Sequence, residues 1–478
     1  MCRTLTGLSL LALAVGCSAT EGPARKLPLE SCRVEGLGKP ASCGVLERPE
    51  DPSAPDGPTV SLRVVVVPAE DPSDRPPVFL LAGGPGQAAT RAWPPILQPF
   101  EPFIEGRDVV LVDQRGTGAS RPLSCPQPES LAEKLRRDHS GQRVRDCLAR
   151  LEADPVHYTT TVAADDLDAV RDALGYTTID LVGGSYGTRA ASVYLRQYPE
   201  RVHAVVLDGL APVDMALPAP FAQDGQRAFE LLVADCDADP ACRAAFGDVG
   251  ALLDRVLDAV GEGKLVRVND PRSGERVEIP IDRDIVAGAV RGLLYQPGLA
   301  AVLPVTLERA AAGDFSPLVA QATLFSDALA EDLAEGMFLS VVCTEDVPFI
   351  TDDMVDGKGS FLGTFIVDEL RRACRVWPAA ELPDGYREPV RSDVPVLLLS
   401  GALDPVTPPR WGEHVAQGLS NARHVIVPGT GHGTLYVGCV PQLVRTFFET
   451  GDPLAVDAAC VEDLRRPPFF IDTAGPPY

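Results

Sequence analysis

Short apolar runs alternate with stretches of helical periodicity along much of the chain. "VFLLA" at 78–82 is apolar throughout and is followed by Gly83-Gly84, whereas "IDLVGG" at 179–184 is apolar except for Asp180 and ends in two glycines. Between them, "TVAADDLDAVRDALGY" places Leu167, Val170 and Leu174 on one face of a helix. Short strands without polar alternation are typical of a parallel sheet that is covered on both faces. The pattern therefore predicts an α/β fold with a mostly parallel central sheet.

The same pattern returns near the C-terminal end of the chain. "VPVLLLSGALDPVTPP" and "ARHVIVPGTGHGT" each read as a short apolar strand that ends in a polar turn. In parallel α/β sheets the chemistry collects at the carboxyl ends of the strands. Asp404 and His432 stand at such positions, which makes them candidates for a site.

Residues 213–390 interrupt this alternation with helical patterns such as "RAFELLVADC" and "AAVLPVTLERAAA". They are expected to form an inserted, mainly helical cap over the site. The sequence thus divides into a signal peptide (1–16), an N-terminal extension (17–57), a first core part (58–212), the cap (213–390), a second core part (391–450) and a C-terminal tail (451–478).

The N-terminus has the features of an export signal. Arg3 is followed by an apolar run from Leu5 to Val15, which is too short to span a bilayer. "ALAVGC" resembles a bacterial lipoprotein box, in which Cys17 becomes the lipidated first residue. With Ser18 next, the resemblance implies sorting to the outer membrane. The alternative is an ordinary secretory signal that is cut a few residues later, giving a secreted or periplasmic protein.

Export changes the interpretation of the cysteines. Apart from Cys2 and Cys17, ten cysteines remain, and an even number in an oxidising compartment favours disulfides. No CxxC pair is present, which argues against zinc. Sequence alone leaves the connectivity open. Pairing between neighbours predicts the bonds Cys32–Cys43, Cys125–Cys147, Cys236–Cys242, Cys343–Cys374 and Cys439–Cys460.

Composition excludes some classes of partner. A hydrophobic fraction of 45% argues against general disorder. The net charge of −24 argues against nucleic acid and against an anionic membrane surface as partners. Contact with a membrane is therefore expected only through the N-terminal lipid anchor.

The run 183–187, "GGSYG", fits the pattern G-x-S-x-G. In that pattern a serine occupies a sharp turn between a strand and a helix, with its hydroxyl exposed. Glycines flank the turn because a Cβ would clash in so tight a bend. The pattern nominates Ser185 as a nucleophile; the alternative is a serine in an ordinary glycine-rich turn.

A serine nucleophile needs a base, and the base needs an orienting acid. His432 follows the last strand in a flexible loop, and Asp404 follows the preceding strand. The chain order Ser185, Asp404, His432 is the order of α/β-hydrolases. The alternative for Asp404 is an aspartate that caps the turn before Pro405.

The oxyanion of the tetrahedral intermediate needs hydrogen-bond donors. The backbone N–H of Tyr186, directly after the nucleophile, is one candidate. The second is the N–H of Gly84 in "GGPG" after the first core strand, since Pro85 has no N–H.

Five motifs in this order, "GGPG", "DQRGTGAS", "GGSYGT", "GALDPVTP" and "GTGHG", resemble the proline iminopeptidase-related α/β-hydrolases. More closely, they resemble the secreted tripeptidyl-aminopeptidase branch with its TAP-like C-terminal part. The similarity covers about residues 58–450. It departs at Ala82, where histidine is common. The resemblance implies hydrolysis of short peptides from the amino end through an acyl-enzyme, without metal or cofactor.

The resemblance also assigns two further segments. It implies that "DQRGTGAS" braces the site, with an Asp–Arg ion pair rather than a catalytic role for Asp113, Arg115 or Ser120. It further implies that acidic residues of the cap bind the substrate's ammonium group. Glu345 is the first candidate and Asp346 the second; the alternative is a surface Glu-Asp pair without function.

Three functions stay open on the sequence. The first is an exported serine aminopeptidase. The second is an esterase or amidase on non-peptide substrates, because a triad alone does not select the acyl group. The third is an inactive surface lipoprotein that binds peptides, which the intact Ser185, Asp404 and His432 argue against.

Overall fold

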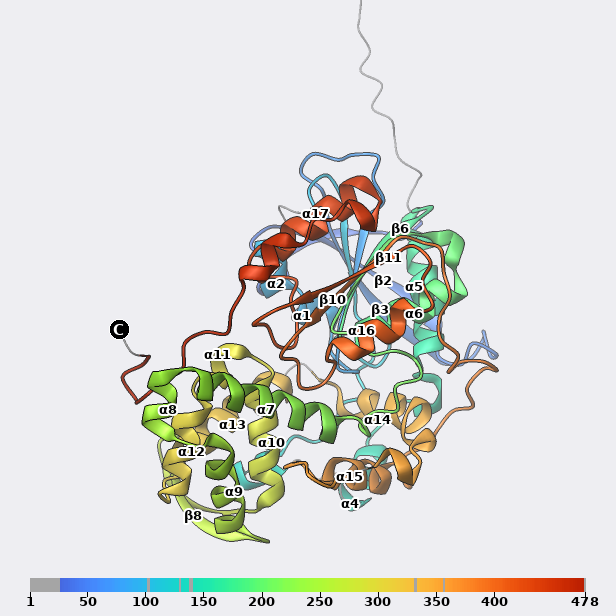
Figure 1. The fold of residues 1–478 in the computed structure, drawn as a ribbon. Coiled ribbons are helices and arrows are strands. Elements are labelled where there is room, and N and C mark those ends of the chain that lie inside the picture. The colour runs from blue at the N-terminus through green and yellow to red at the C-terminus, as the bar shows by residue number, and fades with distance from the viewer. Residues whose placement is uncertain are drawn as a thin grey trace, which may run out of the picture.

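The computed structural model describes residues 26–476 except 101–103, 129, 137–140, 331–332 and 356. Within these residues nine strands form one mixed sheet in the order β1-β2-β3-β5-β4-β6-β7-β10-β11 (Figure 1). The strands are β1 (Glu30–Cys32), β2 (Ala41–Pro49), β3 (Thr59–Val67), β4 (Val78–Leu81), β5 (Val109–Val112), β6 (Ile179–Gly184), β7 (Val202–Asp208), β10 (Val396–Gly401) and β11 (Ala422–Val427).

The sheet is parallel from β5 through β4, β6, β7 and β10 to β11, and antiparallel from β1 to β5. The predicted mostly parallel sheet is thereby confirmed. β1 and β2 were not predicted, because their segment was assigned to the N-terminal extension. β2 lies near the sheet edge and is mostly half-buried, so its sequence lacks the continuous apolar run of a central strand.

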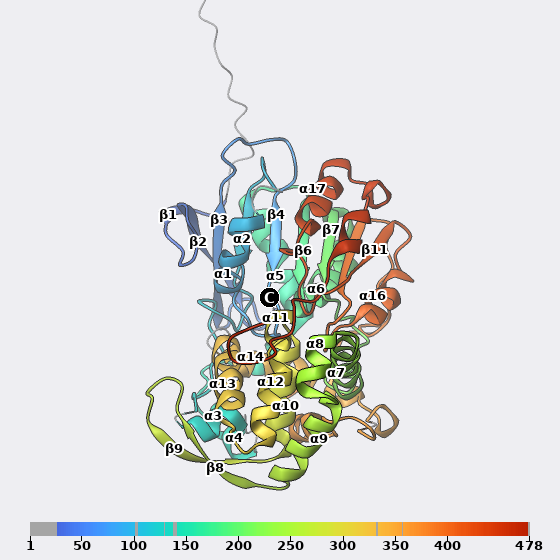
Figure 2. The same ribbon diagram turned by 60° about the vertical axis from the view of Figure 1, so that its left-hand side comes forward.

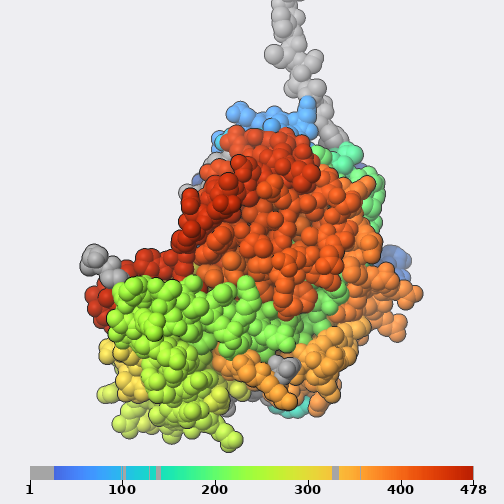
Figure 3. Space-filling model, viewed as in Figure 1, coloured from blue at the N-terminus to red at the C-terminus, as the bar shows by residue number. Residues whose placement is uncertain are grey.

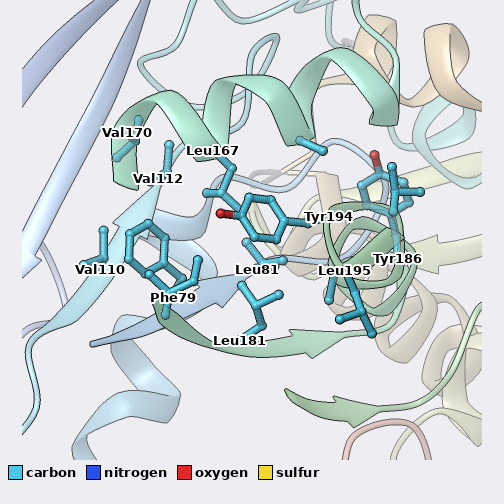
Figure 4. Packing of buried hydrophobic residues seen from close by; sticks show 14 of the residues in the cluster. Phe79, Leu81, Val110, Val112, Leu167, Val170, Leu181, Tyr186, Tyr194 and Leu195 are labelled. Carbon is cyan, nitrogen blue, oxygen red and sulfur yellow. The ribbon is translucent and has the colours of Figure 1, made fainter. Parts of the chain in front are cut away.

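Successive residues of the central strands face two different helix layers. Phe79 and Leu81 of β4 pack towards α5 and α6, whereas Val78 and Leu80 pack towards α1, α2 and α17. Figure 4 shows the first of these cores, with Phe79 and Leu181 of the sheet beneath Leu167 of α5. The helices are α1 (Ala89–Ala92), α2 (Pro94–Phe100), α5 (Thr160–Leu174), α6 (Tyr186–Gln197), α16 (Pro409–Ala416) and α17 (Val440–Thr450).

Helix α5 begins and ends where its sequence provides caps. The Thr159 hydroxyl accepts a hydrogen bond from the backbone N–H of Val162, and Gly175 ends the helix in the left-handed region at φ 81°. Leu167, Val170 and Leu174 are buried, as their common face predicts.

The cap comprises the elements between β7 and β10, and it lies beside the carboxyl ends of the parallel strands (Figures 1 and 2). It is mainly helical, with one β-hairpin and its own hydrophobic core. Its elements are α7 (Phe221–Ala238), α8 (Pro240–Phe246), α9 (Val249–Val260), β8 (Lys264–Asn269), β9 (Arg276–Ile281), α10 (Arg283–Leu294), α11 (Pro297–Ala300), α12 (Leu303–Ala311), α13 (Ser316–Ala330), α14 (Glu335–Glu345) and α15 (Phe365–Cys374).

Two segments from elsewhere in the chain also pack on the cap. Helix α3 (Leu131–Arg136) contacts α13, and α4 (Gly141–Leu148) contacts α15, although both follow the core strand β5. The C-terminal segment crosses from the core to the cap. There Phe469 is buried, and the Phe470 backbone N–H donates a hydrogen bond to the Ala301 carbonyl at 3.1 Å. The space-filling view shows the first part of the cap, in green, directly against the C-terminal part of the core, in orange and red (Figure 3).

Five disulfides join the ten cysteines in the neighbouring pairs that the sequence predicts: Cys32–Cys43, Cys125–Cys147, Cys236–Cys242, Cys343–Cys374 and Cys439–Cys460. Disulfides in this number are typical of an extracytoplasmic protein. The expected signal peptide and Cys17 lie outside the described residues. None of the helices within the described residues is both long and apolar enough to cross a bilayer.

Candidate active site

Ser185 occupies the turn between strand β6 and helix α6. Its backbone has φ 55° and ψ −123°, a conformation that non-glycine residues rarely adopt. The turn is held by its neighbours, since the Ser185 N–H donates to the Asp208 carbonyl at 2.9 Å and the Thr188 hydroxyl donates to the Ser185 carbonyl at 2.6 Å. The strained backbone therefore presents the serine at the edge of the sheet, as a nucleophile elbow requires.

The glycines on either side of Ser185 are required by close packing. A Cβ on Gly183 would lie 2.4 Å from the Gly187 carbonyl oxygen, and a Cβ on Gly187 would lie 2.3 Å from the Leu81 carbonyl oxygen. Both distances are far below van der Waals contact. Steric fit thus requires the two glycines of the G-x-S-x-G pattern, Gly183 and Gly187, whereas a Cβ on Gly184 would meet no atom within 4 Å.

Asp404 and His432 form a hydrogen-bonded pair. Nδ1 of His432 lies 2.8 Å from Oδ2 of Asp404, which also accepts a hydrogen bond from the Thr407 hydroxyl at 2.7 Å. The backbone N–H groups of Val406 and Thr407 donate to Oδ1 of Asp404 at 2.8 and 2.9 Å. With its Nδ1 bound to the carboxylate, the imidazole leaves Nε2 for other chemistry.

The pair stabilises its charged form. Burial works to raise the pKa of Asp404, but the His432 charge and the hydrogen bonds outweigh burial and lower that pKa. For His432, burial opposes protonation, but the Asp404 charge and hydrogen bond raise the pKa above the ordinary value of 6.5. The imidazole is therefore a stronger base than a free histidine, which suits proton abstraction from a serine.

Asp208, at the end of β7, connects the nucleophile turn to the histidine loop. Its carbonyl accepts the Ser185 N–H, while its buried carboxylate accepts hydrogen bonds from the N–H groups of Thr434 (2.6 Å) and Leu435 (3.1 Å). Sequence analysis missed this residue. A signal existed, because Asp208 follows the apolar run "AVVL" at a strand end, as Asp404 nearly does.

The residues of the two expected oxyanion donors, Gly84 and Tyr186, both line the cavity at Ser185. A Cβ on Gly83 would lie 3.1 Å from the Ser185 Cβ, so the "GGPG" loop closely approaches the nucleophile. Within the described part of the chain, neither the Gly84 N–H nor the Tyr186 N–H donates to a protein acceptor. Both donors are thus available to a ligand at Ser185.

A cavity of about 1210 Å³ lies between the core and the cap, and Ser185, His432, Gly84 and Tyr186 line it. Its walls combine apolar and charged side chains. The apolar ones include Phe221, Phe325, Phe338 and Phe365, and the acidic ones include Asp146, Glu335 and Glu369. Among the described residues, no cluster of three His, Cys, Asp or Glu side chains is placed to hold a metal ion.

The cap contacts the catalytic histidine directly. The backbone N–H of His432 donates to the backbone carbonyl of Tyr295 at 2.9 Å. The side-chain rings of the two residues meet edge to face, with centroids 5.2 Å apart. A Cβ on Gly431 would lie 2.2 Å from the same carbonyl oxygen. Tyr295, at the end of α10, therefore helps to hold the histidine loop. The sequence carried no signal for this contact.

The structure corrects the assignment of Glu345 and Asp346 to the substrate's ammonium group. The segment is the end of the buried helix α14 rather than a surface loop, both side chains have no exposed area, and neither lines the cavity. Two oxygens of Asp346 accept hydrogen bonds from Arg189, each at 2.9 Å. An apolar run preceded the two residues because the whole helix is internal.

Glu345 instead supports the nucleophile turn from behind. Its Oε1 accepts the Thr160 N–H and its Oε2 accepts the Thr160 hydroxyl, both at 2.8 Å, and the Tyr386 hydroxyl also donates to Oε2. The Thr160 hydroxyl in turn meets the Tyr186 hydroxyl at 2.7 Å. Burial raises the pKa of Glu345, against the opposing Arg189 charge and the Tyr386 and Thr160 hydrogen bonds. A chain of hydrogen bonds thus links α14 to the residue after Ser185.

The N-terminal end of helix α14 contacts the "GGPG" loop, which contains the other expected oxyanion donor, Gly84. The Ala334 N–H donates to the Gly86 carbonyl at 2.9 Å, and a bridge pairs Gln87 with Leu333. One cap helix is therefore hydrogen-bonded near both expected oxyanion donors. This relation joins segments about 150 residues or more apart in sequence, and no local pattern encodes it.

The loop "DQRGTGAS" has a structural role, but its ion pair differs from the expected one. Arg115 pairs with Asp166 of α5, at 2.7 and 2.9 Å, rather than with Asp113. Asp113 accepts hydrogen bonds from the Thr90 N–H (2.9 Å) and hydroxyl (3.0 Å). The Ser120 hydroxyl accepts the Arg63 N–H at 2.8 Å. The loop joins α5, α1 and β3, which is a bracing role.

The chain matches two families of known proteins. Residues 76–245 match the alpha/beta hydrolase fold family, and residues 360–460 match the TAP-like protein family. Both matches include predicted site residues, since Ser185 lies in the first and Asp404 and His432 lie in the second.

Curated relatives match most of the chain at low identity. The serine protease Hip1 of Mycobacterium tuberculosis is 26% identical over 469 residues, which is 88% of this chain and 87% of the relative. The tripeptidyl aminopeptidase of Streptomyces lividans is 24% identical over 465 residues, 90% of this chain and 86% of the relative. A solved proline iminopeptidase of Mycobacterium smegmatis covers 86% of this chain and 100% of its own, at 17% identity and a TM-score of 0.44.

Proposed function

Because the chain is an α/β-hydrolase with a TAP-like C-terminal part, we propose that it is an exported serine exopeptidase. It cleaves short peptides from the amino end, with tripeptidyl or prolyl aminopeptidase specificity, through an acyl-enzyme on Ser185. The observation that carries this proposal is the hydrogen-bonded Asp404–His432 pair facing the same cavity as the serine of a strained elbow. The similarity to a serine protease and to tripeptidyl aminopeptidases over most of the chain supports the peptide substrate.

The reaction follows from the roles of these groups. Nε2 of His432 takes the hydroxyl proton of Ser185 as the oxygen attacks the peptide carbonyl carbon. The N–H groups of Gly84 and Tyr186 stabilise the oxyanion. His432 then gives the proton to the leaving amine as the C–N bond breaks, and water hydrolyses the acyl-enzyme by the same sequence. Asp404 keeps the imidazole oriented and stabilises its charge.

The cap explains why short peptides are the expected substrates. Together with the core it surrounds a cavity of about 1210 Å³, which accommodates a few residues of a peptide. Acidic and basic side chains both line the cavity. Glu335 is paired with Arg143 at 2.9 Å. Asp146 and Glu369 are the acidic wall residues proposed to favour a positively charged amino terminus over a blocked one.

The second candidate is an esterase or amidase on non-peptide substrates. The phenylalanine side chains on the cavity wall favour an apolar acyl group, and the triad itself accepts esters. The strained Ser185 turn and the hydrogen-bonded Asp404–His432 pair argue against the third candidate, an inactive peptide-binding lipoprotein.

Two assays separate these candidates. A fluorophosphonate probe should label Ser185 in the active enzyme, and absence of labelling would leave only the inactive binding protein. Tripeptidyl and aminoacyl reporters are then compared with N-acetylated forms and with simple esters. Faster cleavage of the free-amine peptides supports the exopeptidase, whereas equal cleavage of free and acetylated peptides, or of esters alone, contradicts it.

Export belongs to the same proposal. The five disulfides support an extracytoplasmic site, and the lipoprotein box supports a lipid anchor on Cys17 in the bacterial cell envelope, in the outer membrane. Mass spectrometry of the mature N-terminus tests the anchor. A lipidated Cys17 is expected, and an unmodified terminus a few residues later would instead make the protein secreted or periplasmic.

A further inference from the structure

Arg291 is a cation on the cavity wall that is held by aromatic rings. It lies on α10 of the cap and lines the same cavity as Ser185 and His432. One guanidinium nitrogen donates to the Tyr295 hydroxyl at 3.0 Å, and the guanidinium lies 4.7 Å from the Phe221 ring centre and 5.5 Å from that of Tyr295. Within the described residues, no carboxylate forms an ion pair with it. A partly buried arginine usually has an anionic partner, so its position favours an anionic ligand.

The position of Arg291 relative to the reaction follows from Tyr295. The Tyr295 hydroxyl accepts the Arg291 hydrogen bond, and the Tyr295 ring packs edge to face on the His432 imidazole, with centroids 5.2 Å apart. The positive charge of Arg291 acts on the imidazole, where it works to lower the pKa of His432 against the stronger effect of Asp404. Arg291 is therefore separated from the catalytic base by one aromatic side chain.

The histidine side of the nucleophile is where the leaving group lies. In acyl transfer the imidazole that took the serine proton gives it to the departing amine, so that amine must lie near His432. A group beside His432 that faces the cavity can therefore contact the part of the substrate that leaves first. Arg291 meets this condition.

We propose that Arg291 binds a carboxylate on the leaving group of the substrate, on the carboxyl side of the scissile bond. This inference rests on the proposed exopeptidase function. A guanidinium recognises a carboxylate through two parallel N–H donors, which also fixes the orientation of the group it binds. The carboxylate has two sources in a short peptide: the α-carboxylate of the residue that is released, or an acidic side chain on that residue. Either would restrict the enzyme to substrates with a negative charge close to the cleaved bond.

The test uses the mature full-length protein and three tetrapeptides that share the first three residues, Ala-Ala-Ala. Their fourth residue is alanine with a free carboxylate, alanine amide or glutamic acid amide. We expect kcat/KM for a carboxylate-bearing peptide to exceed that for alanine amide by about 10- to 100-fold. A preference for the free acid identifies the α-carboxylate, and a preference for glutamic acid amide identifies the side chain.

The variants are Arg291→Gln, Arg291→Lys and the control Arg255→Gln, which alters an exposed arginine on α9 that does not line the cavity. In Arg291→Gln the ratio of kcat/KM for the carboxylate-bearing peptide to kcat/KM for the amide peptide should fall to about one. Arg291→Lys should retain part of this preference. A ratio is unaffected by loss of folded protein, because both substrates meet the same enzyme. Arg255→Gln should keep the wild-type ratio.

Two results would overturn the proposal. In the first, wild type has the same kcat/KM for alanine amide as for both carboxylate-bearing peptides. In the second, Arg291→Gln keeps the wild-type ratio of kcat/KM between the carboxylate-bearing and amide peptides. If no peptide is cleaved, the exopeptidase function fails separately. The same ratio is then measured with the acetyl esters of 4-hydroxybenzoate and 4-hydroxybenzamide, which differ only in the charge of the leaving group. An Arg291-dependent preference for the benzoate ester supports the proposal, and its absence contradicts it.

Discussion

The core and the cap contribute to the candidate active site in different ways. In the core, the expected catalytic groups follow the ends of strands β6, β10 and β11 and are held by short-range contacts, such as the backbone donors to Asp404 from two and three residues away. The cap supplies no member of the expected triad, but it touches the catalytic parts at His432, at the Gly86 loop and behind Tyr186. The core thus carries the expected triad, whereas the cap contacts the segments that surround it.

The largest expected effect is in the core. Ser185→Ala should lower turnover by about 10⁴-fold or more, because the nucleophile is lost while the elbow backbone can remain. Activity on a cleavable peptide and the thermal unfolding midpoint are measured together. The control is Ser420→Ala, which alters an exposed serine remote from the cavity and should behave as wild type. Retained activity in Ser185→Ala would refute the triad.

The Asp404–His432 pair predicts a pH dependence as well as a rate. His432 must be neutral to act as a base, and Asp404 raises its pKa, so kcat/KM should rise with pH through a midpoint above 6.5. Asp404→Asn should lower kcat by about 10⁴-fold. It should also move the midpoint to lower pH, since burial of the imidazole then acts without the carboxylate. An unchanged midpoint in Asp404→Asn would show that another group titrates.

Two adjacent cap carboxylates offer a sharper comparison. Glu345→Gln should lower kcat by about 10- to 100-fold with little change in KM, because the hydrogen-bond chain through Thr160 supports Tyr186 and its oxyanion N–H. Asp346→Asn removes the nearer of the two carboxylates beside the buried Arg189, with Glu345 at 3.6 Å as the other, and should cost about 3 kcal/mol of unfolding free energy.

The readout for this pair is kcat and KM of the folded fraction, determined by active-site titration, beside urea unfolding. A specific loss of kcat in Glu345→Gln would support alignment by the cap. If both variants lose only stability and their folded fractions turn over normally, the cap does not align the oxyanion donors.

Disulfides give the smallest expected effect on turnover and compare the two regions directly. Replacing Cys343 and Cys374 by serine should destabilise by about 4 kcal/mol, and replacing Cys32 and Cys43 by about 3 kcal/mol, from loops of 31 and 11 residues. Only the first pair holds α14, so only its removal should lower kcat in the folded enzyme, by a few-fold. Equal kcat values for the two variants would contradict a role of α14 in alignment.

Sequence reasoning reached the core because its signals are local. Apolar runs predicted the central strands, strand-end positions nominated Asp404 and His432, and glycine spacing nominated Ser185, whose elbow has the strained backbone that the motif requires. The nearest-neighbour cysteine pairs also follow local spacing, since short loops close most readily. The edge strand β1 and its neighbour β2 were not predicted, because exposed and half-buried strands at this side of the sheet carry a weak apolar pattern.

What the sequence alone determined is the order of strands and helices and the identity of the groups at the strand ends, because backbone periodicity and steric demands act between near neighbours. Only the tertiary structure decided which distant groups meet. Glu345 accepts a hydrogen bond from Thr160, which lies 185 residues away in sequence. Arg115 forms its ion pair with Asp166, 51 residues away, rather than with Asp113, two residues before it. Tyr295 reaches His432 from another domain-sized segment. Such pairings depend on how the cap docks on the core and on the burial of charged groups. A local sequence pattern predicts neither.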